Sequence, residues 1–283
     1  MNEATDLLSI PEIFDRTISI FARSFGPAAL SRFPSGAVQL LFWTLQRLTR
    51  DPTLHVTYLA LWAIAWCVEQ WGRAAAVAIF SAGMRHEPLS ARDAYRRTRK
   101  VVFSCCIVSA PPLVFLAING HQGNAGNWLD PLTANPLSAV LVALVLVVIA
   151  LLYLLIVTMG SMSLALAFVA CVLEEVGPWR AFQRGFRRTL GRRLWRRAAA
   201  VVLITALLLC VTVVPPFLAF EHYGHDTRWR FPLEGFIAIA IALFLDALAV
   251  VYSRDIQVRQ EGLDLVAALA AMPSDSMTRS GGR

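Results

Sequence analysis

The stretch that decides the fold is Leu137–Leu173, which reads LSAVLVALVLVVIALLYLLIVTMGSMSLALAFVACVL. It contains no Asp, Glu, Lys or Arg. An uncharged apolar run of about 18 or more residues is typical of a membrane-spanning helix, because about 20 helical residues cross the hydrocarbon core. The apolar residues are continuous rather than alternating, which indicates a helix and not a strand of a membrane barrel. The stretch therefore predicts a transmembrane α-helix.

The length of this stretch raises a second question. As one helix it would be about 55 Å long at about 1.5 Å per residue, whereas the hydrocarbon core is only about 30 Å thick. The helix must project from the membrane, tilt strongly or break. Met159-Gly160-Ser161 is the natural place for a break, since glycine weakens a helix. A break near the membrane centre would favour a transporter, and a projecting helix would favour a structural role.

Five further apolar segments have the same character, in a chain of 283 residues that is 57 % apolar with a mean hydropathy of +0.58. We expect spans at residues 27–46, 55–80, 101–118, 198–220 and 236–252. The first is the weakest, because Arg32 and Pro34 interrupt it, and a kinked span and a re-entrant segment both fit. The expected fold class is all-α: a polytopic transmembrane helical bundle of about six spans with interfacial amphipathic basic helices.

The two ends of the chain flank this transmembrane domain, which we place at residues 27–252. Ser9 and Glu12 have the spacing of a capping box, and apolar residues recur behind them at helical intervals. Residues 1–26 therefore predict an amphipathic helix that lies in the membrane interface. Residues 253–283 predict a cytoplasmic tail, which becomes loose after residue 270 because Pro, Ser and Gly replace the apolar residues there.

Positive charge sets the expected orientation. Fourteen of the 26 lysine and arginine residues fall in two segments, 85–100 and 180–197, and the loop 119–136 has none. Because positive residues stay cytoplasmic, both segments, the C-terminus and, with six spans, the N-terminus face the cytoplasm. We expect a multi-pass protein of the cell membrane. The net charge of +7 lies between apolar runs, which favours anionic lipid over nucleic acid as a partner.

Both basic segments are amphipathic. Ser90 predicts a helix cap in the first, with Asp93 at the third position. The apolar face of the second consists of Trp179, Phe182, Phe186, Leu190 and Leu194. Such helices can lie on a membrane with their arginines on lipid phosphates, and the candidates for this contact are Arg96, Arg97, Arg184, Arg187 and Arg188. Anchoring and orientation alone is the simpler interpretation, and a docking face for a cytoplasmic partner is another.

The ionisable candidates inside the expected spans are Glu69, Arg73 and Asp246. Glu69 and Arg73 are four residues apart, so they share a helix face and can pair. Arg73 is also an obvious partner for Asp246. Burying charge in lipid is costly, which makes such residues functional candidates. A structural interhelical ion pair is the plainer interpretation, and an ion or proton path is the alternative.

A short internal repeat links the two basic segments. Ala94-Tyr-Arg-Arg-Thr98 recurs as Gly185-Phe-Arg-Arg-Thr189. In both places an apolar helix running inward leads to a basic segment and then to an outward helix. Two copies with one membrane orientation imply an axis along the membrane normal, as in parallel-repeat transporters.

Motifs of catalysis and metal binding are absent. The chain has no nucleophile elbow, P-loop, dinucleotide fingerprint or HExxH motif, so we expect no enzyme and no cofactor, although an unusual intramembrane enzyme stays open. His121, His222 and His225 match no strong metal motif. We expect small buried side chains, without disulfides or metal, at Cys67, Cys105, Cys106, Cys171 and Cys210.

Three features of the chain recur in one bacterial family. The first is the opening Ile10-Pro-Glu-Ile-Phe-Asp15, and the second is an E-x-x-G-x-x-x-A-x-x-R pattern that runs from Glu174 to Arg184. The third is a tail pattern matched by Asp255, Arg259, Glu261, Gly262 and Asp264. In these features the chain resembles uncharacterised membrane proteins related to the membrane domain of glycerophosphoryl diester phosphodiesterases. It departs from the tail pattern in two places, because the tyrosine is displaced to Tyr252 and Gln257 stands where an arginine is usual.

The resemblance implies membrane residence rather than hydrolase activity, because the chemistry of those enzymes belongs to a separate soluble barrel for which this chain has no room after its spans. We therefore expect a non-enzymatic membrane scaffold or accessory subunit that engages anionic lipid and a partner membrane protein. The alternative is a transporter or permease that uses Glu69, Arg73 and Asp246.

Overall fold

The computed structural model describes residues 8–48, 55–111, 144–145, 157, 159–191, 194–208 and 227–270. Every regular element in these ranges is a helix, and they contain no strand. The expected all-α class is confirmed at this level.

The helices differ widely in length. In chain order they are α1 (Ile10–Leu48), α2 (His55–Met84), α3 (Ala91–Thr98), α4 (Val102–Ser109), the helix Met159–Leu173, α7 (Pro178–Leu190), the helix 195–208 and α9 (Thr227–Ala270). The two predicted caps are confirmed. The Glu12 amide donates to the Ser9 hydroxyl at 3.5 Å, and the Asp93 amide donates to the Ser90 hydroxyl at 3.2 Å.

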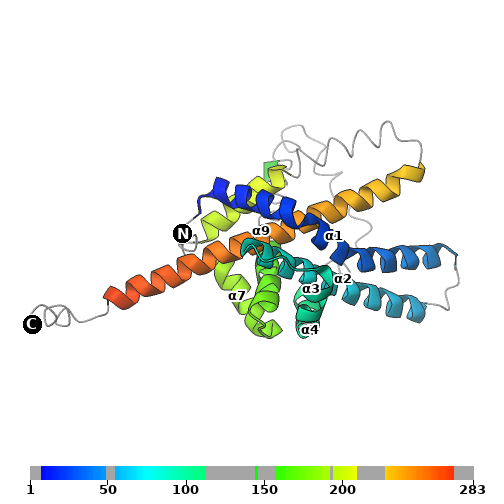
Figure 1. Ribbon diagram of the computed structural model, residues 1–283, viewed down its shortest axis with the longest axis horizontal. Coiled ribbons are helices and arrows are strands. Elements are labelled where there is room, and N and C mark those ends of the chain that lie inside the picture. Colours follow the sequence, from blue (N-terminus) through cyan, green and yellow to red (C-terminus); the bar gives the residue numbers. More distant parts are fainter. Residues whose placement is uncertain are drawn as a thin grey trace, which may run out of the picture.

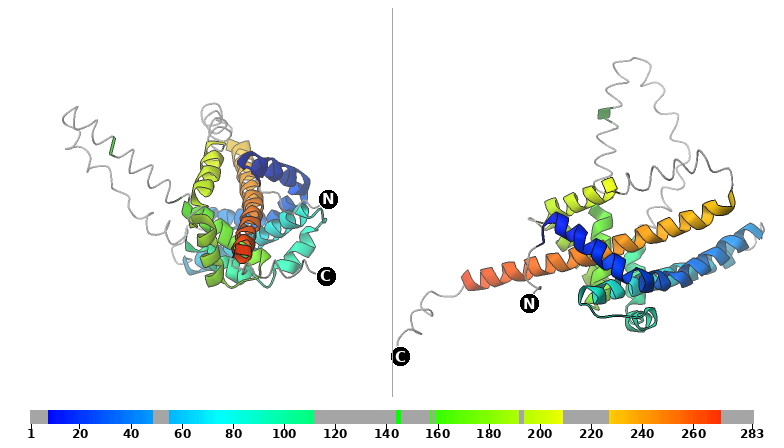
Figure 2. Two further views of the ribbon diagram at one scale, coloured as in Figure 1. Left: turned by 90° about the vertical axis from the view of Figure 1, so that its left-hand side faces the viewer. Right: turned by 45° about the horizontal axis from the view of Figure 1, so that its top comes forward.

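The long helices form the frame of the molecule (Figure 1). α1 packs against α2 along much of its length and also contacts α9. α9 crosses the body, and its last turns project beyond the other helices (Figure 2). The short helices α3, α4 and α7 gather below α9 in the view of Figure 1. α9 thus reaches both ends of the molecule.

Three continuous segments make the centre of the core. Residues 74–80 of α2, residues 166–172 and residues 247–253 of α9 are all buried. A helix that is buried on every side needs apolar residues all round. The second half of the uncharged stretch that opened the sequence analysis is therefore a central core helix, whatever solvent surrounds the bundle.

Small residues let the helices approach closely. A Cβ atom on Gly72 of α2 would lie 2.7 Å from the Ser31 carbonyl oxygen of α1, and one on Gly185 of α7 would lie 2.3 Å from the Ser163 carbonyl oxygen. Both distances are shorter than van der Waals contact, so only glycine fits without movement. Small residues at helix contacts are common in membrane bundles, where packing replaces the hydrophobic drive.

The expected breaks and boundaries differ from the described helices. α1 is continuous from Ile10 to Leu48 although it contains Pro27 and Pro34, so residues 10–26 and the first expected span share one helix. α9 likewise continues past residue 252 to Ala270. Gly160 lies within a helix, and the Ser161 hydroxyl donates to the Val157 carbonyl one turn earlier at 2.7 Å. The predicted break is therefore not seen there.

Within the described part of the chain, one segment is long and apolar enough to cross a membrane: Phe236–Gln260, of which half is buried inside the molecule. The six-span bundle is not confirmed. α2 is long, but Glu69, Gln70 and Arg73 interrupt its apolar character, and much of the third, fourth and fifth expected spans lies outside the described residues. The finding is compatible with membrane association, and a central core helix has the same features.

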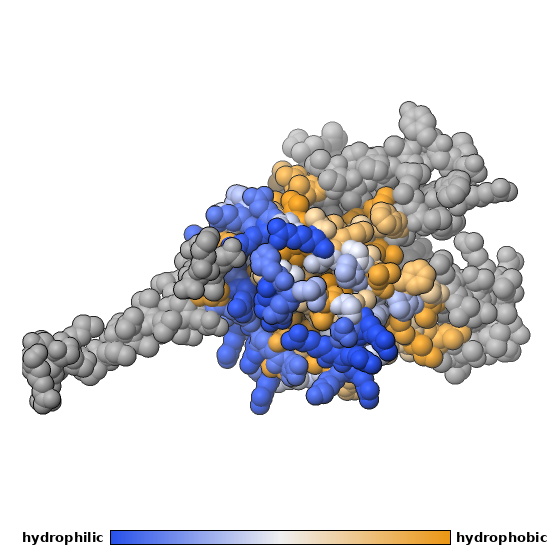
Figure 3. All heavy atoms as spheres, in the orientation of Figure 1, coloured by the Kyte–Doolittle hydropathy of each residue, from blue (hydrophilic) through white to orange (hydrophobic). Residues whose placement is uncertain are grey.

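Polar and apolar side chains are separated on the surface (Figure 3). Hydrophilic residues cover the side that holds α3, α7 and the middle of α9, and hydrophobic residues cover the adjoining part of the body. Several large apolar side chains are strongly exposed: Leu30, Phe33, Phe103, Leu203 and Leu207. Extended exposed apolar surface marks contact with a membrane or with another protein.

Candidate functional site

Three carboxylates along α9 or beside it share one arrangement, because each is held by two arginines. They are Asp246, Asp255 and Glu174. Burying a carboxylate in a protein is costly unless it is paired and hydrogen-bonded. The three groups are therefore the first places to look for function.

The first group joins three long helices near the middle of the core. Asp246 of α9 accepts from Arg32 of α1 at 2.7 Å and from Arg73 of α2 at 2.8 Å. Only 3 % of the Asp246 side chain is exposed. Arg73 also lies over the ring of Phe168, 4.5 Å from its centroid. Each carboxylate oxygen therefore has its own arginine.

This group only partly matches the set that the sequence predicted. The structure brings Arg73 and Asp246 together, and Glu69 lies half-buried one turn away on the same helix. Arg32 is the member that sequence reasoning missed, because it counted only as a weakness of the first expected span. Its charge in an apolar segment was the signal. A carboxylate fixed by two guanidiniums favours a structural ion pair over a mobile proton or ion path.

The second group fastens α7 to α9. Glu174 accepts from both Arg184 and Arg188 of α7, and from the Gln257 amide of α9 at 2.8 Å. Arg188 also reaches the Ser253 hydroxyl at 3.4 Å. Burial lowers the pKa of the Arg188 guanidinium below its ordinary value.

The burial of Arg188 differs from the prediction that it lies on the lipid surface. Only 8 % of its side chain is exposed. Its helix turns Ala181, Gly185 and Thr189 inward, and Arg188 falls on the same face. The sequence analysis correctly separated this face from the aromatic residues, but it assigned Arg188 to the lipid surface.

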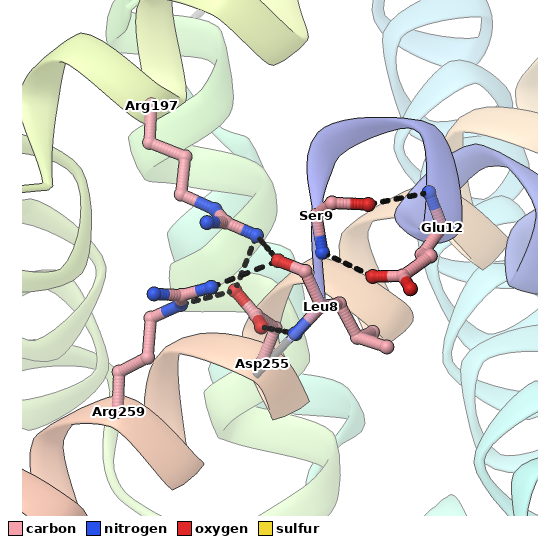
Figure 4. A network of polar contacts seen from close by, with 6 residues as sticks. All are labelled: Leu8, Ser9, Glu12, Arg197, Asp255 and Arg259. Atoms are coloured by element: carbon pink, nitrogen blue, oxygen red, sulfur yellow. Dashed lines mark hydrogen bonds and ion pairs between the residues drawn. The ribbon is translucent and has the colours of Figure 1, made fainter. Parts of the chain in front are cut away.

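The third group holds the start of the chain (Figure 4). Asp255 of α9 pairs with Arg259 at 3.0 Å and with Arg197 at 3.3 Å. The Leu8 amide donates to Asp255 at 3.1 Å, and the Leu8 carbonyl accepts from Arg259 at 2.8 Å and from Arg197. Glu12 lies beside this group, bound to Ser9, and those hydrogen bonds lower the pKa of its carboxyl. One backbone unit is thus bound by three charged side chains.

The outer face of α7 is a separate candidate surface, which we call the α7 outer face: Trp179, Arg180, Phe186, Arg187 and Leu190. Trp179 is 72 % exposed, Leu190 56 % and Phe186 44 %, and both arginines are exposed. The apolar face predicted for this segment is thus divided, because Phe182 and Leu194 pack partly against the core instead. Interleaved aromatic and arginine side chains suit the boundary between lipid headgroups and acyl chains.

The α3 helix presents its predicted arginines differently. Arg96 and Arg97 are exposed, and Ala94 and Thr98 are buried on the opposite face. Tyr95 turns inward, where its hydroxyl donates to the Ser31 carbonyl of α1. α3 therefore has exposed charge without exposed aromatic rings.

The remaining predictions concern cysteine and metal. Cys105 and Cys171 are buried, Cys106 is half-buried and Cys67 is exposed, so the prediction of burial is wrong for Cys67. Cys210 and the three loop histidines at positions 121, 222 and 225 lie outside the described residues. Within the described ranges, no three His, Cys, Asp or Glu side chains are grouped as metal ligands.

No family model, curated protein or solved structure matches the chain. The resemblance to the membrane domain of glycerophosphoryl diester phosphodiesterases stays a hypothesis that rests on the residues quoted for it. Any functional conclusion must therefore come from the surfaces and contacts described above.

Proposed function

We propose that this chain is a multi-pass protein of the cell membrane that acts as a scaffold or accessory subunit. In this proposal it binds anionic lipid through the α7 outer face, and its polar end docks a partner membrane protein. Both termini face the cytoplasm. The observation that carries the proposal is that Trp179 and Phe186 remain exposed between exposed arginines, although the opposite face of α7 is docked on the core.

Exposed apolar side chains support the membrane setting. Leu203 and Leu207 lie one turn apart and are 70 % and 63 % exposed, and Phe103 of α4 is 76 % exposed. Contact with lipid would remove this apolar area from water. Hydrophilic residues cover the side that holds α3 and α7, next to hydrophobic surface of the body (Figure 3), where lipid phosphates would meet the arginines of these helices.

The geometry gives less support to the transporter alternative. A path for ions or protons needs groups that change partners, whereas both oxygens of Asp246 are bound by arginines. We therefore retain the scaffold as the proposal.

The lipid part is tested by native mass spectrometry of detergent-purified protein that is offered phosphatidylglycerol and phosphatidylcholine at low salt. We expect preferential retention of phosphatidylglycerol, and about fivefold weaker retention for Arg187→Gln, because one surface arginine contributes about 1 kcal/mol near an anionic membrane. Arg187→Lys keeps the charge and is the matched control. Equal retention of the two lipids by the unsubstituted protein would refute the proposal.

The topology is tested by labelling single introduced cysteines in sealed membranes. A cysteine in the segment 92–100 and one in the loop 119–136 should react with an impermeant reagent from opposite sides. Reaction of both from the same side would contradict the proposed orientation.

A further inference from the structure

The contacts around Asp255 are unusual for a simple structural bond. Arg197 and Arg259 both donate to a single neutral oxygen, the carbonyl of Leu8. Both arginines also pair with the Asp255 carboxylate, so two cations share one anion and one neutral carbonyl. A guanidinium binds an anionic oxygen through Coulomb attraction as well as hydrogen bonds, so a second anion would be held more strongly by this fork of two arginines than the carbonyl.

A second observation points to the same place. Tyr252 is completely buried, and among the described residues its hydroxyl has no hydrogen-bond partner. The buried Arg197 Nε likewise finds no acceptor in the part of the chain that the structure describes. Tyr252, Asp255 and Arg259 follow one another on the same face of α9, three and four residues apart, and Tyr252 lies within electrostatic range of both arginines.

Both of these groups can donate a hydrogen bond. A buried donor without an acceptor loses its hydrogen bond to water and gains none in return, so its presence calls for an explanation. The Leu8 carbonyl cannot supply the missing acceptors, because its single oxygen already accepts from two guanidiniums. An oxyanion with several oxygens can satisfy the fork and the additional donors together.

We propose that Arg197, Arg259 and Tyr252 form a binding site for a phosphate group, and that the Leu8 carbonyl occupies this site when no phosphate is bound. Asp255 is a positioning residue, because it forms ion pairs with both guanidiniums and holds them side by side. Glu12 also acts on Arg197, but its carboxylate is engaged by the Ser9 amide. Phosphate binding releases residues 8 and 9 from α9.

Two sources of phosphate fit this chemistry. Arg197 immediately precedes the expected span at 198–220, and Tyr252 ends the expected span at 236–252. If the proposed membrane setting holds, the site lies at the level of lipid headgroups, and the ligand is a lipid phosphate. Free phosphate from the cytoplasm has the same chemistry and does not depend on that setting.

The test uses the full chain in a neutral detergent at low salt, with binding measured by isothermal titration calorimetry. Inorganic phosphate is titrated in one arm and short-chain phosphatidylglycerol in the other. Tyr252→Phe removes one oxygen and keeps the ring, so we expect about fivefold weaker binding for the loss of one hydrogen bond. Tyr95→Phe is the matched control, since it removes a hydroxyl bonded elsewhere, and its affinity should equal that of the unsubstituted protein.

Hydrogen exchange at the Leu8 amide supplies a second readout. This amide donates to Asp255, and phosphate should accelerate its exchange by releasing the segment. Binding of either ligand with loss of affinity in Tyr252→Phe supports the site, and the arm that binds more tightly identifies the source. The proposed phosphate site would be overturned if Tyr252→Phe bound the ligand as tightly as the unsubstituted protein, or if neither inorganic phosphate nor phosphatidylglycerol bound. Neither result affects the α7 outer face, which is tested separately through Arg187.

Discussion

α3 and α7 share a five-residue pattern: a small residue, an aromatic residue, two arginines and a threonine. The first and last residues of the pattern have the same role in both helices. Ala94 and Gly185 are the buried small residues, and Thr98 and Thr189 are buried one turn later. Each threonine hydroxyl donates to the carbonyl of its small residue at 2.9 Å. The inner face of the pattern therefore docks a short basic helix in both places.

The middle of the pattern is used differently. Tyr95 turns inward to α1, whereas Phe186 stays 44 % exposed. Arg97 is exposed, whereas Arg188 is buried against Glu174 and Ser253. The same motif therefore fastens α3 through a tyrosine and α7 through an arginine. Only in α7 does the aromatic ring of the motif stay exposed.

The turns before the two helices are also alike. His86 follows α2 with φ of 57°, and Glu175 follows the helix Met159–Leu173 with φ of 50°. Such left-handed residues commonly end helices, although glycine is the usual choice. The likeness therefore extends beyond the five residues that the sequence matched.

Removing the buried arginine should have the largest effect. Arg188→Met leaves Glu174 without its inner partner, and breaking a buried pair costs about 3–5 kcal/mol. We expect about 3 kcal/mol of lost unfolding free energy, because 17 % of the Glu174 side chain is exposed. Chemical unfolding in detergent measures this change in the free energy of unfolding. Arg97→Met at the matching position of α3 should change the free energy of unfolding little. Equal losses at both positions would contradict the distinction between a buried arginine in α7 and an exposed one in α3.

The small residue of the pattern is the next test. Gly185→Ala places a Cβ atom 2.3 Å from the Ser163 carbonyl oxygen, and overpacking of this kind costs about 1–3 kcal/mol. The reciprocal change Ala94→Gly should cost about 1 kcal/mol through helix propensity alone. Unfolding in detergent compares the two, and a neutral Gly185→Ala would mean that α7 is less tightly docked than described.

Substitutions at the aromatic position should produce a smaller difference in stability between the two helices. Tyr95→Phe loses the hydrogen bond to the Ser31 carbonyl and should cost about 1 kcal/mol. Phe186→Tyr adds a hydroxyl to an exposed ring and should leave the thermal midpoint unchanged in detergent. A larger change at position 186 than at 95 would contradict the assignment of inner and outer rings.

The smallest expected effect concerns the threonine hydrogen bond that both helices share. Thr98→Val and Thr189→Val each remove one hydroxyl bond and should each cost about 1 kcal/mol or less. Because the two contacts have the same length, the two losses should agree within error in parallel unfolding experiments. Unequal losses would show that the pattern docks the two helices differently.

Much of the local structure could be predicted from the sequence. The Ser9 and Ser90 caps depend on neighbouring residues alone, and the amphipathic character of α3 follows from helical spacing. The all-α class followed from long apolar runs. The six spans are not confirmed, because hydropathy cannot distinguish a helix buried in protein from one buried in lipid. Residues 166–172, for example, are surrounded by protein.

The ionic contacts depend on which distant residues meet, and the sequence gives no direct signal of this. Arg73 and Asp246 were predictable as opposite charges in apolar segments, but Arg32 was given no partner and Arg188 was assigned to the lipid surface. The fork on Leu8 joins residues nearly at opposite ends of the chain. Long-range contacts of this kind follow from the packing of α1 and the helix 195–208 on α9.

We propose that the aromatic ring of Phe186 in α7 faces lipid, whereas the ring of Tyr95 in α3 faces α1. The most direct test places the photo-crosslinking residue p-benzoylphenylalanine at position 186 or at position 95, followed by illumination of native membranes and mass spectrometry. The account predicts phospholipid adducts from position 186 and intramolecular crosslinks to α1 from position 95. Crosslinks to protein alone from position 186, or lipid adducts in equal yield from both positions, would contradict it.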